Sequence, residues 1–307
     1  MMKIAIIGGG AIGLLFSHYL SQKHEIILYV RNENQRNIIN SSGITVQNKN
    51  HLSKTKVRVE LVAEWGLNGE ELSIICVKQY QLQQLLETAN ISRDHSLLFL
   101  QNGMGHLKWI DHYGLENVLV GSVEHGVYRK KENSVVHTGD GCTKIAHYKG
   151  DVNGISLELS KQFHDTFPFV IEDDFQEMLQ KKLVVNAIIN PLTSILKVQN
   201  GVLLENSYYF QVFNELFTEI KGILNIQEEQ LYYENVIEVC RKTGKNRSSM
   251  LKDIEEHRPT EVDAILGYLI EEAEKKGVQA PLINTLFRLI KGSEIKGGGE
   301  LDVRNLF

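Results

Sequence analysis

The chain has 307 residues, which is long enough for two domains and a sizeable core. Its formal net charge of −5 argues against a nucleic-acid or membrane-surface partner. No apolar run is long enough to span a bilayer, and the three widely spaced cysteines predict free thiols, so we expect a cytoplasmic protein without a signal peptide. The scattered histidines predict no metal site.

A glycine-rich turn follows the first predicted strand. Residues 2–7 are largely apolar and β-branched, and residues 14–20 have the apolar spacing of a helix. Between them, Gly8, Gly10 and Gly13 have the G-x-G-x-x-G spacing of dinucleotide-binding proteins. There the first glycine allows a tight turn, the second lets a pyrophosphate approach the backbone, and the third lets helix and strand pack closely. The turn therefore predicts a dinucleotide at the N-terminus of the first helix.

The second predicted strand, residues 25–30, ends at Arg31. NAD enzymes usually carry an Asp or Glu near this position, where it binds the ribose 2′-hydroxyl. A guanidinium can instead bind a 2′-phosphate with two hydrogen bonds, so Arg31 favours NADP(H). The alternative is a solvated arginine in a polar loop over residues 31–37, which also contains Glu33 and Gln35.

Two further buried strands end in polar residues. Residues 72–77 end at Lys78, and residues 96–101 end at Asn102. Because the carboxyl ends of strands form the ligand crevice of a doubly wound sheet, both side chains are candidates for cofactor contact. The alternatives are a solvated lysine at a strand end and a turn asparagine before Gly103.

The other N-terminal segments complete an α/β pattern. Short strands are predicted at residues 44–46, 56–59, 118–121, 135–137, 143–146 and 169–171, with a helix at 155–163. We expect the first two strands to form an excursion, and the next three to extend the sheet at its far edge as antiparallel strands. The expected fold is a Rossmann-type domain over residues 1–172, with a doubly wound and mostly parallel sheet, followed by an all-α domain over 173–307.

A long apolar helix is predicted from residue 175 to 196, and it carries a polar stripe. Lys182, Asn186 and Asn190 are four residues apart and therefore project from one face. Pro191 should kink or end the helix. A buried stripe of this kind needs polar partners, which leaves two interpretations open: a face in solvent, or a face lining a cleft between the domains.

The rest of the chain is predicted to be almost entirely helical. Helices are expected over residues 210–225, 228–243, 259–276 and 281–291, and another begins near Arg247 with a serine at or near its cap. Glu261 would lie in the first turn of its helix, where the helix dipole alone favours a carboxylate.

These stretches resemble the ketopantoate reductase (2-dehydropantoate 2-reductase) family over nearly the whole chain. The glycine motif is shared by many dehydrogenases, whereas the stretches at 182–193 and 246–254 are far more specific, and their order and spacing fit the family. The matching segments are Gly8-Gly9-Gly10-Ala11-Ile12-Gly13, Val77-Lys78, residues 101–105, residues 182–193, residues 246–254 and Thr260-Glu261-Val262-Asp263.

The resemblance implies an active site between a Rossmann domain and a helical domain. The implied cofactor-binding residues are Gly8, Gly9, Gly10, Ala11, Ile12, Gly13, Arg31, Lys78, Asn102 and Glu261. Lys182 is the implied catalytic lysine, and Glu261 is linked to catalysis as well as to the cofactor. The implied substrate-binding residues are Asn102, Lys182, Asn186, Asn190, Asn200 and Ser249.

The implied activity is the NADPH-dependent reduction of ketopantoate, a 2-keto acid, to pantoate in pantothenate and coenzyme A synthesis, by a monomer or homodimer. Hydride would reach C2 of the substrate, and Lys182 would stabilise and protonate the developing alkoxide. Two alternatives stay open. One is a related two-domain dehydrogenase acting on another 2-keto or hydroxy acid, and the other is an NADP(H)-sensing regulator without turnover.

Overall fold

The computed structural model describes residues 1–49 and 51–295, and the chain divides into two compact units, Met1–Leu179 and Gln180–Phe307. The first unit contains the strands and the second is helical, which confirms the predicted fold class. The final residues of the predicted helical domain, 296–307, lie outside the described residues. Within the described part of the chain, no helix has both the length and the apolar character needed to cross a membrane.

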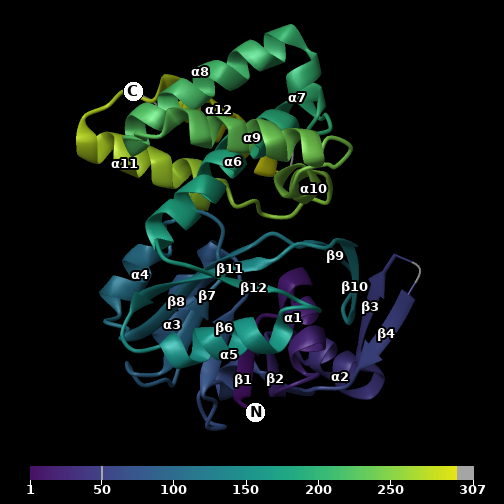
Figure 1. Ribbon diagram of the computed structural model, residues 1–307. Coiled ribbons are helices and arrows are strands. Elements are labelled where there is room, and N and C mark those ends of the chain that lie inside the picture. Colours follow the sequence, from purple (N-terminus) through teal and green to yellow (C-terminus); the bar gives the residue numbers. More distant parts are fainter. Residues whose placement is uncertain (50, 296–307) are drawn as a thin grey trace. The chain divides into compact units, whose positions relative to one another are not determined.

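An eight-stranded sheet runs through the first unit (Figure 1). Its order is β12-β11-β8-β7-β6-β1-β2-β5, and all neighbouring strands are parallel except β11 and β8. The strands are β1 (Lys3–Ile7), β2 (Glu25–Val30), β5 (Arg58–Leu61), β6 (Leu72–Ile75), β7 (Ser96–Phe99), β8 (Asn117–Val123), β11 (Thr143–Lys149) and β12 (Phe169–Glu172). The inner strands are continuous apolar runs because both faces of the sheet are covered.

A second sheet of four strands has the order β4-β3-β10-β9. Its strands are β3 (Ile44–Asn48), β4 (His51–Thr55), β9 (Gly126–Lys131) and β10 (Ser134–Gly139). Helix α1 (Ala11–Leu20) contacts strands of both sheets and lies between them (Figure 1). Val46 and Val135 of the second sheet are buried in the same core as the apolar face of α1.

Two of the predicted strand positions were wrong. The strand at 135–137 does not extend the main sheet, because β10 pairs with β3 and β9 and buries Val135 in the core around α1. The strand at 56–59 does not belong to an excursion, because β5 pairs with β2 and buries Val59 in the main core. The antiparallel pair of β8 and β11 does extend the main sheet, as predicted.

The α-helices of the first unit include one in a region that one interpretation of the sequence placed in a loop. They are α1, α2 (Glu33–Ser42), α3 (Leu82–Thr88), α4 (Leu107–His112) and α5 (Asn153–Phe163). The alternative interpretation placed residues 31–37 in a polar loop, but Asn32 caps α2, its side chain accepting a hydrogen bond from the Gln35 N–H at 2.7 Å. Only Gln35 and Ile39 of α2 are buried, so its sequence has almost no apolar periodicity.

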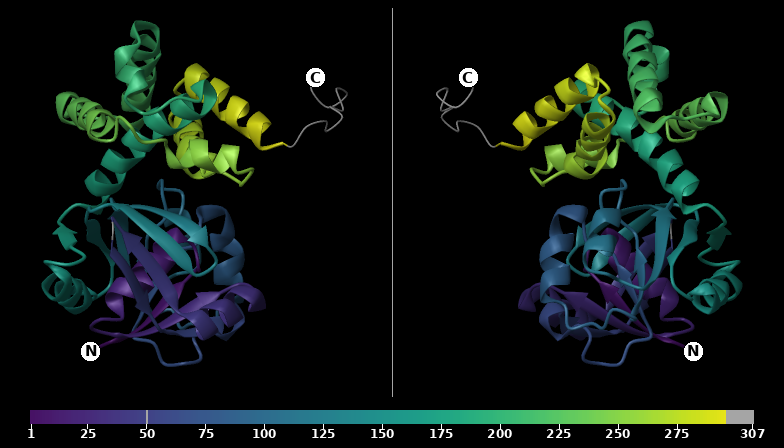
Figure 2. Two further views of the ribbon diagram at one scale, coloured as in Figure 1. Left: turned by 90° about the vertical axis from the view of Figure 1, so that its right-hand side faces the viewer. Right: turned by 90° about the vertical axis from the view of Figure 1, so that its left-hand side faces the viewer.

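Most helices of the second unit were predicted, but the short α7 (Val202–Glu205) was not, and the helix predicted from residue 259 begins only at Val262. The other helices are α6 (Phe175–Leu196), which begins in the first unit, α8 (Ser207–Leu224), α9 (Glu229–Lys242), α10 (Ser249–Glu255), α11 (Tyr268–Lys276) and α12 (Pro281–Glu294). A π-helical turn at Asp263–Gly267 leads into α11, which ends at Gly277 in the left-handed conformation. Figure 2 shows the later helices, in green and yellow, on both sides of α6.

Pro191 does not end α6, so one of the two outcomes predicted for it does not occur. Pro191 lacks the N–H that would donate to the Ala187 carbonyl oxygen, and the Thr193 hydroxyl bonds to two other carbonyl oxygens of this stretch. Thr193 Oγ1 lies 2.7 Å from the Ile189 carbonyl oxygen and 3.2 Å from that of Asn190. Leu183, Ala187 and Ile188 of the same helix are fully buried, so tertiary packing supports α6 on the N-terminal side of the proline.

Candidate active site

Four sets of predicted cofactor residues follow four neighbouring parallel strands. The glycine turn follows β1, Arg31 follows β2, Lys78 follows β6 and Asn102 follows β7, and these strands lie in the order β7-β6-β1-β2. All four positions are therefore at the carboxyl edge of one sheet. The chain leaves β1 toward β2 on one side and returns to β6 on the other, which makes this edge the topological switch point where doubly wound folds bind ligands.

The backbone of the glycine turn requires glycine at two positions. Gly8 has φ +116°, a conformation that side chains rarely adopt, and its N–H donates to the Tyr29 carbonyl oxygen at 2.9 Å. A Cβ on Gly13 would lie 1.8 Å from the Gly8 carbonyl oxygen. Helix α1 therefore approaches β1 more closely than any residue with a side chain would allow.

Gly10 has a different environment from the other glycines of the turn. A Cβ built there would have no heavy atom within 4 Å, so the space beside it is open. Gly10 is the N-cap of α1, which has no side-chain capping bond and no acidic residue in its first turn. The positive end of the helix dipole and its terminal N–H groups thus face an open space without a competing carboxylate, an arrangement that fits a pyrophosphate.

The ends of β6 and β7 are joined by a buried glutamine. Gln101 Nε2 donates to the carbonyl oxygens of Ile75 at 2.9 Å and Val77 at 2.8 Å. This bridge fixes the segments that carry Lys78 and Asn102 next to each other. Gly103 follows with φ +78°, so the chain turns sharply just after Asn102.

The polar stripe of α6 is partly buried. Asn190 is 7% exposed, whereas Lys182 and Asn186 are half-buried. A stripe in open solvent would not bury Asn190, so its burial agrees better with the interpretation that the face needs polar partners. The roles of the three side chains remain predictions.

The structure brings the start of α10 next to the end of this stripe. Thr193 and Ser248 share a hydrogen bond of 2.8 Å between their side-chain oxygens. Ser248 is the N-cap of α10, because its Oγ accepts a hydrogen bond from the Leu251 N–H at 3.1 Å, which agrees with the serine predicted at or near this cap. Ser249, the predicted substrate residue, follows directly and is exposed. Two segments far apart in sequence thus meet through one buried threonine.

Asn200 and Glu261 lie in other parts of the second unit's framework. Asn200 is buried, its Nδ2 donating to Thr243 Oγ1 at 2.9 Å and its N–H to the Asn246 carbonyl oxygen at 3.0 Å. It therefore holds the loop that leads into α10. Glu261 lies just before the helix that opens with the π-helical turn and not in its first turn, where it was expected, and its carbonyl oxygen accepts from the Ile265 N–H at 3.1 Å. Such π-helical turns are frequent at functional sites.

Comparison with protein families decides the assignment. Residues 4–150 match the family model described as ketopantoate reductase PanE/ApbA, and residues 174–294 match its C-terminal counterpart. The chain belongs to the ketopantoate reductase family. This confirms the resemblance drawn from the sequence and makes the protein an oxidoreductase.

Individual relatives are similar to this chain over almost its whole length. The 2-dehydropantoate 2-reductase of Bacillus subtilis is 39% identical over 95% of this chain and 98% of its own, and that of Listeria monocytogenes is 34% identical over 98% and 99%. A crystal structure of a probable 2-dehydropantoate 2-reductase from Bacillus subtilis has a TM-score of 0.87 at 37% identity, with 95% and 100% of the two chains covered. A D-mandelate dehydrogenase bound to NADH and anilino(oxo)acetate also reaches 0.87, at 25% identity over 95% and 98%.

The structure reveals residues beside the glycine turn that the sequence did not single out. Gln35 Nε2 donates to the carbonyl oxygens of Gly9 and Glu132, each at 2.8 Å. Arg129 Nη1 lies 3.4 Å from the same Gly9 oxygen. Gln35 entered the sequence argument only as a neighbour of Arg31, and neither contact can be found from spacing along the chain.

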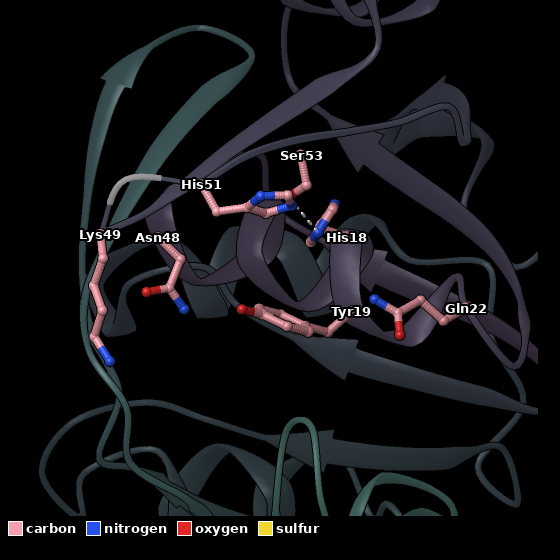
Figure 3. Close-up of a pocket in the computed structure, with 7 residues that line it drawn as sticks. All are labelled: His18, Tyr19, Gln22, Asn48, Lys49, His51 and Ser53. Carbon is pink, nitrogen blue, oxygen red and sulfur yellow. Dashed lines mark hydrogen bonds between the residues drawn. The ribbon is translucent and has the colours of Figure 1, made fainter.

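A hollow elsewhere in the first unit lies between α1 and the β3–β4 hairpin (Figure 3). It is lined by His18, Tyr19, Gln22, Asn48, Lys49, His51 and Ser53. The His18 ring nitrogens lie 3.0 Å from Ser53 Oγ and 2.6 Å from Thr55 Oγ1, and burial lowers the pKa of this histidine. These bonds hold the hairpin against α1, so we assign His18 a structural role in this hollow.

Proposed function

We propose that this chain reduces ketopantoate to pantoate with NADPH, the reductive step of pantothenate and coenzyme A synthesis. The observation that carries the proposal is the 39% identity to the Bacillus subtilis 2-dehydropantoate 2-reductase over 95% of this chain. The residues of the specific stretches at 182–193 and 246–254 support it, because they supply a lysine, two asparagines and a serine for a small polar acid.

The cofactor assignment is supported by the geometry of the first unit. The open space beside Gly10 and the uncapped start of α1 suit a pyrophosphate. Arg31 is exposed at the end of β2, where a 2′-phosphate would gain a charge-assisted hydrogen bond and a ribose hydroxyl would not. Lys78 and Asn102 would contact the remainder of the cofactor from the ends of β6 and β7. When bound, NADPH supplies the hydride for the keto carbon.

The protein's own contribution to the reaction is to hold the keto acid and protonate its oxygen. Lys182, as an ammonium group, donates a hydrogen bond to the keto oxygen and transfers a proton as negative charge develops there. Asn186, Asn190 and Ser249 hold the substrate carboxylate and hydroxyl through neutral hydrogen bonds, which orient the keto carbon. Glu261 keeps Lys182 charged between turnovers.

A second candidate substrate is another 2-keto acid. It is favoured by the likeness to D-mandelate dehydrogenase, whose solved complex contains NADH and anilino(oxo)acetate, at 25% identity and a TM-score of 0.87. This alternative keeps the same chemistry and changes the side chain of the acid and the preferred nicotinamide cofactor.

One assay separates the two candidates. The loss of reduced-nicotinamide absorbance is followed with ketopantoate and with the 2-keto acid that corresponds to mandelate, each with NADPH and with NADH. We expect the highest kcat/KM for ketopantoate with NADPH. A higher kcat/KM for the aromatic keto acid would select the second candidate, and a preference for NADH would refute the role given to Arg31.

A further inference from the structure

The β9–β10 hairpin is bound directly to the glycine turn. Gln35, which is 4% exposed, bridges the carbonyl oxygen of Gly9 and that of Glu132, the latter in the turn between β9 and β10. A Cβ on Gly9 would lie 2.6 Å from Gln35 Oε1, so glutamine and turn are in close contact. The hairpin therefore has a fixed position beside the residue that separates the first two motif glycines.

Arg129 is the hairpin residue that reaches this turn. It pairs in register with Val135, which is fully buried in the core around α1, so its side chain leaves the sheet on that same side. Its Nη1 lies 3.4 Å from the Gly9 carbonyl oxygen and 3.4 Å from Glu132 Oε2. The neighbouring Lys130 falls at the irregularity in the pairing of β9 with β10, where it has no register partner.

The present contacts of Arg129 are long, and its guanidinium is accessible. A charge-assisted bond from arginine to a carboxylate or phosphate is usually about 2.7–2.9 Å. The Arg129 and Glu132 side chains are 41% and 38% exposed, so their ion pair is weak and open to exchange. An anion beside Gly9 could thus take over the guanidinium from Glu132 with little reorganisation.

Arg31 follows directly after β2, whose end lies beside the same turn, and its side chain is exposed. The Gly8 N–H donates to the Tyr29 carbonyl oxygen at 2.9 Å, which fixes the end of β2 beside the turn two residues before Arg31. We propose that Arg129 is a second arginine for the 2′-phosphate of NADP(H), acting together with Arg31. This inference rests on the proposed NADPH-dependent function, and it assigns part of the cofactor specificity to a strand outside the Rossmann sheet.

Calorimetric titration of the full chain with NADPH, NADH and 2′,5′-ADP tests the proposal. Because 2′,5′-ADP carries the 2′-phosphate without nicotinamide and NADH lacks that phosphate, the two probes isolate its contribution. For Arg129→Ala we expect the Kd of NADPH and of 2′,5′-ADP to rise about tenfold, the loss of one charge-assisted hydrogen bond, and that of NADH to change less than twofold. Glu132→Gln should tighten NADPH binding, since it removes the competing carboxylate.

Lys130→Ala is the matched control, because it removes a neighbouring charge without a contact to the turn, and it should leave all three affinities within twofold. An equal loss of NADPH and NADH binding in Arg129→Ala, or no loss at all, would overturn the inference. Arg31→Ala separates this outcome from failure of the proposed function. A selective loss of NADPH binding in Arg31→Ala alone keeps the function and rejects Arg129, whereas a wild-type chain without NADPH preference rejects the cofactor assignment itself.

Discussion

Two glycines of the same turn should respond to alanine in opposite ways. The Cβ of Gly13→Ala would lie 1.8 Å from the Gly8 carbonyl oxygen, so α1 must move away from β1. Overpacking of this kind costs about 3 kcal/mol, which is about 6–12 °C in Tm for a unit of this size. The Cβ of Gly10→Ala meets no atom within 4 Å, so the free energy of unfolding should change by less than about 0.5 kcal/mol.

For NADPH affinity, in contrast to stability, Gly10→Ala should be the disruptive substitution. In Gly10→Ala the methyl group occupies the space assigned to the pyrophosphate, and we expect NADPH binding to weaken at least tenfold in a protein that melts like wild type. Thermal unfolding by circular dichroism and fluorescence titration with NADPH measure the two effects. Gly222→Ala, an open position inside α8, is the control, with unchanged affinity and a gain of about 0.5–1 kcal/mol. A Gly13→Ala protein with wild-type Tm, or a Gly10→Ala protein with wild-type affinity, would refute this account of the turn.

Three further predictions follow from the second unit and from the buried histidines. Lys182→Ala should lower kcat by orders of magnitude and leave NADPH binding intact, whereas Lys181→Ala on the same helix should keep a near-normal kcat; equal losses would remove Lys182 from the mechanism. Thr193→Val should raise KM severalfold while Tm falls only slightly, because it breaks the bond to Ser248 that joins the start of α10 to α6. A lower Tm with an unchanged KM would show a purely structural role. Burial lowers the pKa of His106 from 6.5 to about 3, so the folded state binds fewer protons and the free energy of unfolding should fall by about 1.5 kcal/mol from pH 6.5 to 5 at this residue alone. Urea unfolding across that range, compared with His106→Phe, measures it, and identical pH slopes would contradict it.

The parts of the fold that the sequence predicted are those set by local pattern. The glycine turn, the apolar inner strands and the helices after residue 174 each carry their signal within a short window. A serine at or near the start of α10 could be predicted because serine is a preferred N-cap residue, whose side-chain oxygen accepts a hydrogen bond from a free N–H of the first turn. Helix α2 was missed because only two of its residues are buried, so its sequence has almost no apolar periodicity, and only the Asn32 cap marks its start.

The parts that could not be predicted depend on contacts between distant segments. The second sheet exists because β3 and β10 pair, and nothing in either strand specifies the other. The contacts of Gln35 and Arg129 with Gly9 depend on that pairing, so they could not be predicted from the sequence either. The link between Thr193 and Ser248 likewise spans 55 residues and becomes visible only in the folded unit.

The pairing of β3 with β10 also sets an order of assembly during synthesis. The side chain of Asn133 donates to the Gly43 carbonyl oxygen 90 residues earlier in the chain, so one edge of the β3–β4 ribbon must wait for a segment made much later. Such distant closures form more slowly than local ribbons and leave an edge open to wrong partners in the meantime. Because Glu132 lies 97 residues after Gln35, the surroundings of the first turn are complete only once β9 and β10 have been made and β10 has paired with β3.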